Sequence, residues 1–254
     1  MNAPSVYQDV HPMLDAARAE LAPTGVLRAG INLSNFLLVT GRTPSGDPEG
    51  VSPSMAREVA DRLGVEVEYV PFKTPGELAD AAVDDVWDIG LIGAEPERAK
   101  TIAFTAAYVE IEATYLVPGD SPFRSVEDVD SKGVRIAVSG RSAYDLYLSR
   151  NLKHAELVRA KGLPGAVALF VNDKLDAIAG LRPALVNELA NLAGARVLDG
   201  KFTAVQQAFG AQKGKDAAAR YLRDFVEEAK ASGLVARLIE RHGVAGRLSV
   251  APRA

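Results

Sequence analysis

The sequence predicts an α/β fold of two units, each a mainly parallel sheet flanked by helices. Short apolar runs alternate with amphipathic segments along the chain, an order that produces parallel sheets. The length of 254 residues accommodates two units of roughly 100 residues each. No stretch rich in Gly, Ser or Pro separates the units, so we expect two extended hinge strands to join them, near 108–113 and 202–208.

The composition excludes several classes of function. Hydrophobic residues make up 48% and charged residues 24%, the mixture of an ordinary globular protein. The net charge is -4 and no block of Lys and Arg stands out, which argues against a nucleic-acid partner. The chain has no cysteine, which excludes disulfides, thiolate nucleophiles and cysteine-ligated metals.

The sequence contains no targeting or membrane signal that we recognise. No apolar stretch approaches the roughly 20 residues that span a bilayer, so we expect no transmembrane segment. Residues 1–10 lack the basic region and the apolar region of a secretory signal. The sequence as given therefore predicts a cytoplasmic protein.

Helix caps and strand patterns define the first unit. Ser52 and Pro53 predict the start of a helix, with serine as the cap, and Gly64 predicts its end. Thr74 and Glu77 have the spacing of a capping box before the next helix. The remaining expectations are a helix within 11–22, a loop at 40–50, strands at 25–31, 65–70 and 88–94, and an apolar helix face of Leu78, Ala82 and Val86.

The second unit begins near residue 110 and repeats the alternation. Ser142 and Asp145 have capping-box spacing and predict a helix over 142–152. Ser125 and Asp128 predict a short capped helix. The other expected elements are strands at 113–117, 134–139, 175–179 and 196–198, helices ending at 172 and covering 183–193, and two final helices over 217–230 and 234–239.

Arg98 is the most informative residue for function. It follows the apolar run 89–94 and the turn that ends at Pro96, which places it just past the carboxyl end of a buried strand. Ligands bind in crevices at that end of open α/β sheets. A guanidinium also matches a carboxylate through two parallel hydrogen bonds, so Arg98 indicates a site for a small anion. The same residues allow a surface arginine paired with Glu95 or Glu97 on a helical turn.

Four stretches resemble one known family in their order and spacing. They resemble the family 3 solute-binding proteins of polar amino-acid ABC transporters, which have the type II periplasmic-binding-protein fold. The resemblance covers the chain from about residue 24 to 250, and the stretch around Arg98 is its most specific part. The four stretches are residues 25–32, 50–64, 87–108 and 134–142.

The resemblance implies a division into two lobes that close on a ligand held in the cleft between them. Residues 1–109 and 206–254 form lobe 1, and residues 110–205 form lobe 2. The implied ligand is a small carboxylate, an amino acid or a related organic acid, and the implied partner is an ABC permease. No cofactor is implied, and we expect a monomer. The family role also implies a periplasmic location if a signal was removed.

The resemblance assigns the carboxylate of the ligand to two places. Arg98 grips it in lobe 1, and Gly93, five residues earlier, offers its backbone N–H to the same group. In lobe 2 the turn Gly140-Arg141-Ser142 opens a helix. Its free amides and the positive helix end suit an anion, and Ser142 adds its hydroxyl unless capping occupies it.

The loop after the first strand matches the ligand-facing loop of the family, and the second crossing adds weaker candidates for polar contacts. Asn32 and Asn35 lie in the loop after the first strand, near Phe36, and an asparagine suits a polar neutral group because it both donates and accepts. Both asparagines are equally consistent with turns in which they bond their own backbone. Gln206 and Gln207 at the second crossing are weaker candidates, which hinge packing also explains.

The sequence departs from the family where an ammonium would bind. Members that bind α-amino acids place an aspartate shortly after the Asp-Ala pair of lobe 2, and here Arg182 follows instead. An ammonium buried without a counter-charge is costly. Either Glu110 or Glu112 replaces the aspartate, or the ligand is not a standard α-amino acid. In the second case Arg141 and Arg182 favour a more negative ligand, unless both are solvated surface residues.

We expect a binding protein rather than an enzyme. The three histidines, His11, His154 and His242, have no partner at metal-ligand spacing, and no phosphate loop or dinucleotide fingerprint occurs. The alternative is a cyclohexadienyl-dehydratase-like enzyme, because the same fold resembles that enzyme. A general acid would then come from Glu110, Glu112 or Glu188. A cytoplasmic ligand sensor or carrier is a further alternative.

Overall fold

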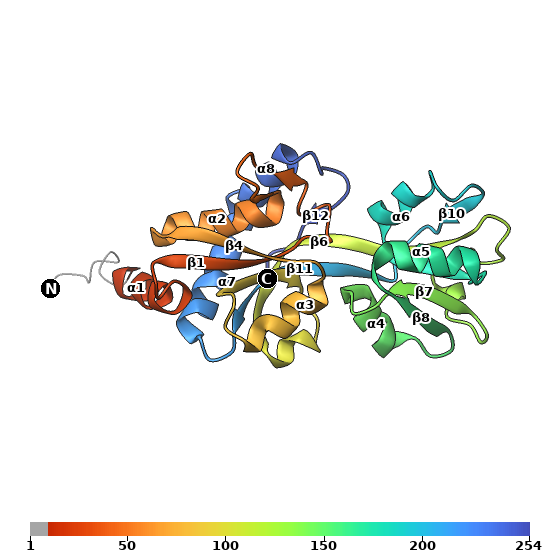
Figure 1. The fold of residues 1–254 in the computed structure, drawn as a ribbon, viewed down its shortest axis with the longest axis horizontal. Helices are drawn as coiled ribbons and strands as arrows, with labels where there is room; N and C mark the ends of the chain where they lie inside the picture. Colours follow the sequence, from red (N-terminus) through yellow and green to blue (C-terminus); the bar gives the residue numbers. More distant parts are fainter. Residues whose placement is uncertain (1–9) are drawn as a thin grey trace. The chain divides into compact units, whose positions relative to one another are not determined.

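The computed structural model describes residues 10–254 of the chain. The expectation about a signal in residues 1–10 therefore falls almost wholly outside the described residues. Contacts within the chain define two compact units, Met1–Val109 with Gln206–Ala254, and Glu110–Val205. The chain crosses between the units on β6 (Ile102–Pro118) and β11 (Thr203–Gln212), which Figure 1 shows as long strands.

The sheet of the first unit has the strand order β4-β1-β5-β11. Strand β1 runs parallel to both β4 and β5, whereas β11 runs antiparallel to β5. Parallel neighbours end at the same edge of a sheet, so the last residues of β1 and β5, Asn32 and Gly93, lie along one edge. The parallel strands are β1 (Val26–Asn32), β4 (Glu66–Phe72) and β5 (Ile89–Gly93).

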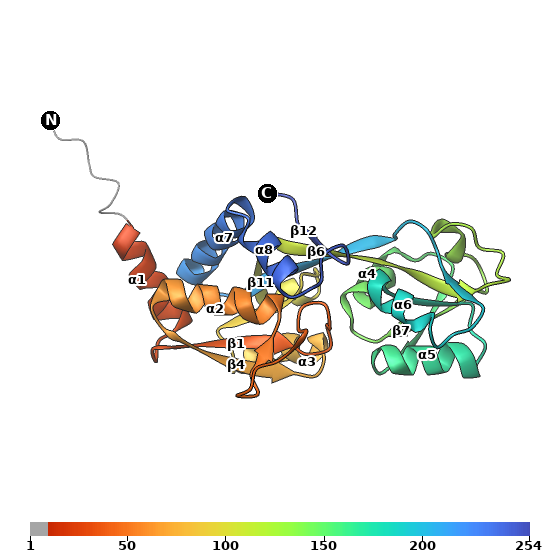
Figure 2. The same cartoon turned by 90° about the horizontal axis from the view of Figure 1, so that it is seen from above.

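Helix α2 (Val51–Leu63) packs on β1 and β4, as Figure 2 shows, and it begins earlier than its sequence signal predicts. Its cap is Gly50, with a φ of 151°, where an added Cβ would overlap the carbonyl oxygen of Leu38. Ser52 lies inside the helix, and its hydroxyl is 2.7 Å from the hydroxyl of Tyr108. The prediction of Ser52 as the cap is wrong because this tertiary contact engages its side chain. The predicted stop at Gly64, in the left-handed region, is confirmed.

Helix α3 (Pro75–Asp80) confirms the predicted capping signal in part. The hydroxyl of Thr74 accepts from the backbone N–H of Glu77 at 3.2 Å. The carboxylate of Glu77 accepts from the backbone of Lys73 at 3.1 Å, one residue before the position that the capping box predicts. Val86 is exposed and lies beyond the helix and the 3-10 turn Ala81–Val83 that follows it, so its predicted place on the helix is wrong.

A row of glycines lets α3 approach the sheet of the first unit closely. Gly30, Gly90 and Gly210 lie opposite one another on β1, β5 and β11. An added Cβ would lie 3.2 Å from the ring of Trp87 at Gly30 and 2.9 Å from a methyl group of Leu78 at Gly90. The indole N–H of Trp87 donates to the carbonyl of Leu78 at 3.1 Å. The absent side chains therefore make room for a fully buried tryptophan beneath α3.

Three helices and three short strands complete the first unit. Figure 2 shows α1 beside α7, and the carboxylate of Glu20 on α1 accepts from the backbone N–H of Ala218 in the first turn of α7, at 2.8 Å. The negative charge of Glu20 also interacts favourably with the positive end of the α7 dipole. The expected loop at 40–50 contains a small hairpin, β2 (Gly41–Arg42) with β3 (Pro48–Glu49). The other elements are α1 (Val10–Leu21), α7 (Asp216–Ala231), α8 (Leu234–Arg241) and β12 (Ser249–Val250).

The second unit is built around the parallel strands β8, β7 and β9. Strand β6 runs antiparallel to β9, and β10 runs antiparallel to β6. Strand β8 was not predicted from the sequence, and α6 is shorter than the predicted helix over 183–193. The elements are η3 (Glu127–Val129), β7 (Arg135–Ser139), α4 (Ala143–Asn151), β8 (Glu156–Ala160), α5 (Gly162–Asn172), β9 (Ala177–Leu181), α6 (Arg182–Glu188) and β10 (Ala195–Val197).

The fold class agrees with the prediction, since both units combine a mainly parallel sheet with flanking helices. Within residues 10–254, no helix has both the length and the apolar character needed to cross a bilayer.

We predict that Gly210→Ala destabilises the protein because its new methyl group would overlap Cγ2 of the buried Ile102. Overpacking of this kind costs about 1–3 kcal/mol. Urea unfolding measures the change, and Gly41→Ala is the control because its Cβ would lie 3.8 Å from the nearest atom, the carboxylate oxygen of exposed Glu49. Equal stability of the two variants would show that the glycine row is not a packing requirement.

Candidate functional site

Arg98 is buried, with 5% of its surface exposed, at the carboxyl end of β5. Its Nη1 donates to the carbonyl of Gly93 at 2.7 Å, which ties the guanidinium to the last residue of the strand. Glu97, in contrast, is exposed and pairs with Lys100 at 2.7 Å. The alternative placed Arg98 at the surface, paired with Glu95 or Glu97, and the burial of Arg98 shows that the surface position is wrong. The structure places a fixed cation at the sheet edge where ligands of open α/β sheets bind.

The burial of Glu95, near Arg98, was not predicted from the sequence. Glu95 has 9% of its surface exposed and lies two residues beyond the end of β5. From the sequence, Glu95 was expected only as a candidate partner of a surface arginine. A glutamate beside Pro96 gives no local signal of burial, because burial here depends on the tertiary structure.

Gln206 lies against the same strand end as Gly93. Strand β11 places Gln207 opposite Gly93, and the backbone carbonyl of Gln206 accepts from the N–H of Ala94 at 2.7 Å. Gln207 is buried. The structure thus brings Gly93, Arg98 and Gln206 together within the first unit. The contact of Gln206 with the strand end is made by its backbone.

The last residue of β1 and the loop after it provide the three other first-unit candidates, Asn32, Asn35 and Phe36. The side-chain oxygen of Asn32 accepts from the backbone N–H of Ser34 at 3.1 Å, and that of Asn35 accepts from Leu37 at 3.2 Å. Both asparagines therefore form the local turns that the sequence allowed as an alternative. Phe36 is exposed at 36%, and the guanidinium carbon of Arg247 lies 5.7 Å from the centre of its ring.

The turn Gly140-Arg141-Ser142 follows the carboxyl end of β7 and opens α4. The hydroxyl of Ser142 caps the helix by accepting from the backbone N–H of Asp145 at 3.1 Å. The buried carboxylate of Asp145 accepts from the backbone N–H of Arg141 at 2.7 Å and from Nε of Arg159 at 3.0 Å. The expectation of free amides in this turn is thus wrong, because a carboxylate of the same helix binds the amide of Arg141. The amides of Gly140 and Ser142 donate to the carbonyls of Ala160 at 2.9 Å and Ser139 at 3.3 Å.

Glu110 and Glu112, both on β6, occupy different environments. Glu110 is half-buried. Glu112 forms ion pairs with Arg182 at 2.9 Å and Lys201 at 3.5 Å, and its pKa is lowered chiefly by the hydrogen bond from Arg182. Arg182 also donates to the carbonyls of Leu198 and Gly200. Glu112 and Arg182 therefore neutralise each other within the second unit.

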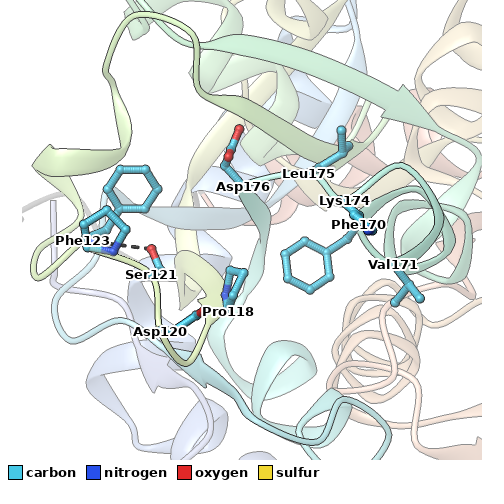
Figure 3. A pocket seen from close by; sticks show the side chains of 10 residues that line it. Pro118, Asp120, Ser121, Phe123, Phe170, Val171, Lys174, Leu175 and Asp176 are labelled. Atoms are coloured by element: carbon cyan, nitrogen blue, oxygen red, sulfur yellow. Dashed lines mark hydrogen bonds between the residues drawn. The ribbon is translucent and has the colours of Figure 1, made fainter.

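The second unit also contains a pocket of about 530 Å³ that the sequence analysis did not identify. Figure 3 shows the rings of Phe123 and Phe170 on different sides of it. Arg196 fixes one wall by donating to the carbonyls of Ser121 and Phe123 at 2.9 and 2.6 Å. None of the candidate residues lines the pocket. The lining residues are Pro118, Asp120, Ser121, Pro122, Phe123, Phe170, Val171, Lys174, Leu175 and Asp176.

Two smaller pockets of the first unit, of about 410 and 400 Å³, also contain none of the candidate residues. His242 lines the second, where its Nε2 lies 2.9 Å from the hydroxyl of Ser54 and burial lowers its pKa. Among residues 10–254, no three His, Asp or Glu side chains gather in a group that could hold a metal ion.

Comparison with known proteins gives one family match. Residues 32–245 match the bacterial extracellular solute-binding proteins, family 3. A curated relative is the cyclohexadienyl dehydratase of Pseudomonas aeruginosa, which is 28% identical over 139 residues. That alignment covers 53% of this chain and 51% of the relative, so the chain matches about half the length of that enzyme.

Solved structures show the same fold. The ancestral amino acid-binding protein AncCDT-1, described as a precursor of cyclohexadienyl dehydratase, is 25% identical, with a TM-score of 0.69 over 90% of this chain and 98% of that one. A putative binding component of an ABC transporter from Wolinella succinogenes, complexed with lysine, is 23% identical, with a TM-score of 0.71 over 86% of this chain and 95% of that one. These likenesses confirm the predicted fold class.

We predict that Ser142→Ala lowers the free energy of unfolding by about 1 kcal/mol in the absence of any ligand, because the first turn of α4 loses its cap. Ser142→Thr keeps a hydroxyl oxygen and should retain most of the stability. Urea unfolding of both variants tests this role, and a Ser142→Ala variant as stable as the wild type would contradict it.

Proposed function

This chain belongs to the bacterial extracellular solute-binding proteins, family 3, and on that basis we propose that it binds a small carboxylate, an amino acid or a related organic acid. The single observation that carries the proposal is the buried guanidinium of Arg98 at the carboxyl end of β5. We include in the proposal the family role of delivering this ligand to an ABC permease, and with it a periplasmic location.

The position of Arg98 suits carboxylate binding for two physical reasons. The hydrogen bond to Gly93 orients the planar guanidinium, which lowers the entropy lost when a ligand binds it. Burial also strengthens the attraction between the guanidinium and an anion, because the local dielectric constant is lower than that of water. A solvated arginine would have neither advantage.

The relatives support an amino acid within this ligand class. One similar structure is a complex with lysine, and another is an ancestral amino acid-binding protein. The pairing of Glu112 with Arg182 weakens the alternative of a ligand with extra negative charge, because Arg182 already has a carboxylate partner.

We predict that Arg98→Lys weakens the binding of every carboxylate ligand by roughly 10- to 100-fold, since lysine keeps the charge but loses the planar fork. Arg98→Ala should abolish binding. Calorimetric titration measures the affinity, and circular dichroism checks the fold. Arg57→Lys is the matched control because Arg57 is a surface arginine of the same unit, with 44% of its side chain exposed. Unchanged affinity in a folded Arg98→Lys variant would refute the site.

The alignment with cyclohexadienyl dehydratase favours a second candidate function, dehydration on the same fold. A general acid that works near neutral pH needs a raised pKa. Glu112 is a poor candidate because Arg182 lowers its pKa. Glu188 accepts a hydrogen bond from the side chain of Asn191 near the end of α6. Glu110 lies half-buried on β6 and is the candidate that the test below addresses.

We expect that incubation of the purified protein with prephenate or arogenate yields no aromatic product above the uncatalysed rate. Ultraviolet absorbance of the product is the measurement. Catalysed formation of the product, lost in Glu110→Gln, would replace the binding proposal with the dehydratase function.

A further inference from the structure

We propose that the pocket of about 530 Å³ in the second unit is a second ligand site, which takes a small organic cation with a ring and one ammonium group. The volume lies within the roughly 300–1,000 Å³ that small-molecule pockets of proteins occupy. This site is separate from that of the proposed function, because its ligand needs no carboxylate and Arg98 belongs to the first unit. Four features support the assignment, namely the position of the pocket on the sheet, its fixed walls, its aromatic rings and its charge.

The pocket lies at one edge of the sheet of the second unit. Leu175 and Asp176 directly precede β9, and Pro118 is the last residue of β6, which runs antiparallel to β9. The pocket therefore adjoins the amino ends of the parallel strands. The turn of residues 140–142 follows the carboxyl end of β7, which is parallel to β9, so it lies at the opposite edge. The pocket is thus distinct from the anion site that the family resemblance implies for this unit.

Two arginines fix the backbone of the segments that line the pocket. Arg196 donates to three backbone carbonyls of the segment 119–123, at 3.4, 2.9 and 2.6 Å. Nη2 of Arg135 donates to the carbonyls of residues 173 and 174 at 3.3 and 3.2 Å. The backbone N–H of Arg135 donates to the carboxylate of Asp176 at 2.8 Å. Because both segments are already ordered, less entropy is lost when a ligand binds against them.

Aromatic and aliphatic side chains form the apolar part of the lining. The rings of Phe123 and Phe170 lie on different sides of the pocket (Figure 3). Val171 also lines it, with 52% of its surface exposed. A ring-bearing ligand gains from contact with aromatic side chains, and the face of an aromatic ring also attracts a cation. These side chains therefore suit a ligand whose apolar ring carries an ammonium group.

The charged residues that line the pocket favour a cation. They are Asp120, Lys174 and Asp176, so the two carboxylates outnumber the single ammonium. Within residues 10–254, neither carboxylate forms an ion pair, and Asp176 is half-buried. Lys174 is exposed, and a side chain of its length keeps its ammonium in water. A ligand ammonium is thus attracted by both carboxylates, whereas a ligand carboxylate is repelled by them.

The test compares three probes that share an indole ring and differ in charge. Tryptamine carries an ammonium group, 3-ethylindole is neutral, and indole-3-propanoate carries a carboxylate. NMR titration of the full chain follows the amide signals of residues 119–123 and 171–176, which report binding at this pocket. We expect tryptamine to bind there at least roughly 10-fold more tightly than either of the other probes.

Val171→Arg tests the location of the site. It adds bulk and a positive charge to the lining, so we expect it to weaken tryptamine binding at least roughly 10-fold. Since the side chain of Val171 is exposed, its replacement should not prevent folding. Val186→Arg is the matched control because Val186 is exposed to a similar extent, 49%, on α6 of the same unit and does not line the pocket. It should leave the affinity unchanged.

Asp176→Asn tests the role of the charge. Asparagine keeps an oxygen that can accept from the backbone of Arg135 but loses the negative charge. We expect roughly 10-fold weaker binding of tryptamine and unchanged binding of 3-ethylindole. Asp173→Asn is the matched control, since Asp173 is exposed in the same segment and does not line the pocket. If Asp176→Asn folds poorly, Asp120→Asn provides the same comparison from an exposed position.

Tryptamine binding that exceeds that of 3-ethylindole and is weakened by Val171→Arg supports the assignment. Absence of any amide shift with tryptamine overturns it, as does equal affinity for tryptamine and 3-ethylindole. Unchanged tryptamine affinity in Val171→Arg also overturns it, because the ligand would then bind elsewhere. None of these outcomes depends on Arg98, so they leave the proposed function to its own test.

Discussion

The bond from Arg98 to the carbonyl of Gly93 is the interaction on which the organisation of the candidate site depends. It joins a buried cation to the last residue of β5, a strand whose five residues are all buried. A rigid strand end fixes where the charge lies, and the turn over residues 95–99 then fixes Glu95 relative to the backbone of Arg98. The strand end, rather than a ligand, therefore determines the position of the Arg98 guanidinium.

Several other charged residues form ion pairs or hydrogen bonds with partners in their own unit. Arg28 binds Asp88 at the amino end of β5, and Glu112 binds Arg182 beside β9. The carboxylate of Asp145 occupies the first turn of α4, where the sequence suggested room for a ligand anion. These pairs stabilise strand and helix ends, so they reduce the number of charged groups that a ligand could use.

Local signals predicted much of the fold because they depend on nearby residues. Gly64 ends its helix, and Thr74 and Ser142 cap theirs, where the sequence placed them. Ser52 failed as a cap because its hydroxyl contacts Tyr108, a residue distant in sequence. Strand β8 was missed because its burial is only partial and polar residues interrupt its pattern, so it carries a weak strand signal.

The sequence predicted those residues of the candidate site whose location follows from the end of a buried strand. Arg98 and Gly93 follow from the buried strand, whereas the burial of Glu95 depends on tertiary contacts. The bond from the Arg141 amide to Asp145 is local, but capping-box spacing does not show which backbone amide the carboxylate binds. Nothing in a glutamate next to a proline distinguishes a buried residue from a solvated one. The ligand-binding roles of Asn32, Asn35, Phe36, Gly93, Arg98, Glu110, Gly140, Arg141, Ser142 and Gln206 stay predictions.

The alignment of Gly30, Gly90 and Gly210 across three strands has a consequence for how this family member can diverge. These three glycines are far apart in the sequence but lie in one line across neighbouring strands. We therefore expect all three positions to tolerate larger side chains poorly. Replacement of one of these glycines by a larger residue would require a smaller residue at Trp87, Leu78 or Ile102, because those side chains occupy the adjacent space. Selection should therefore act on these glycines and their bulky neighbours as a coupled set, independently of any ligand.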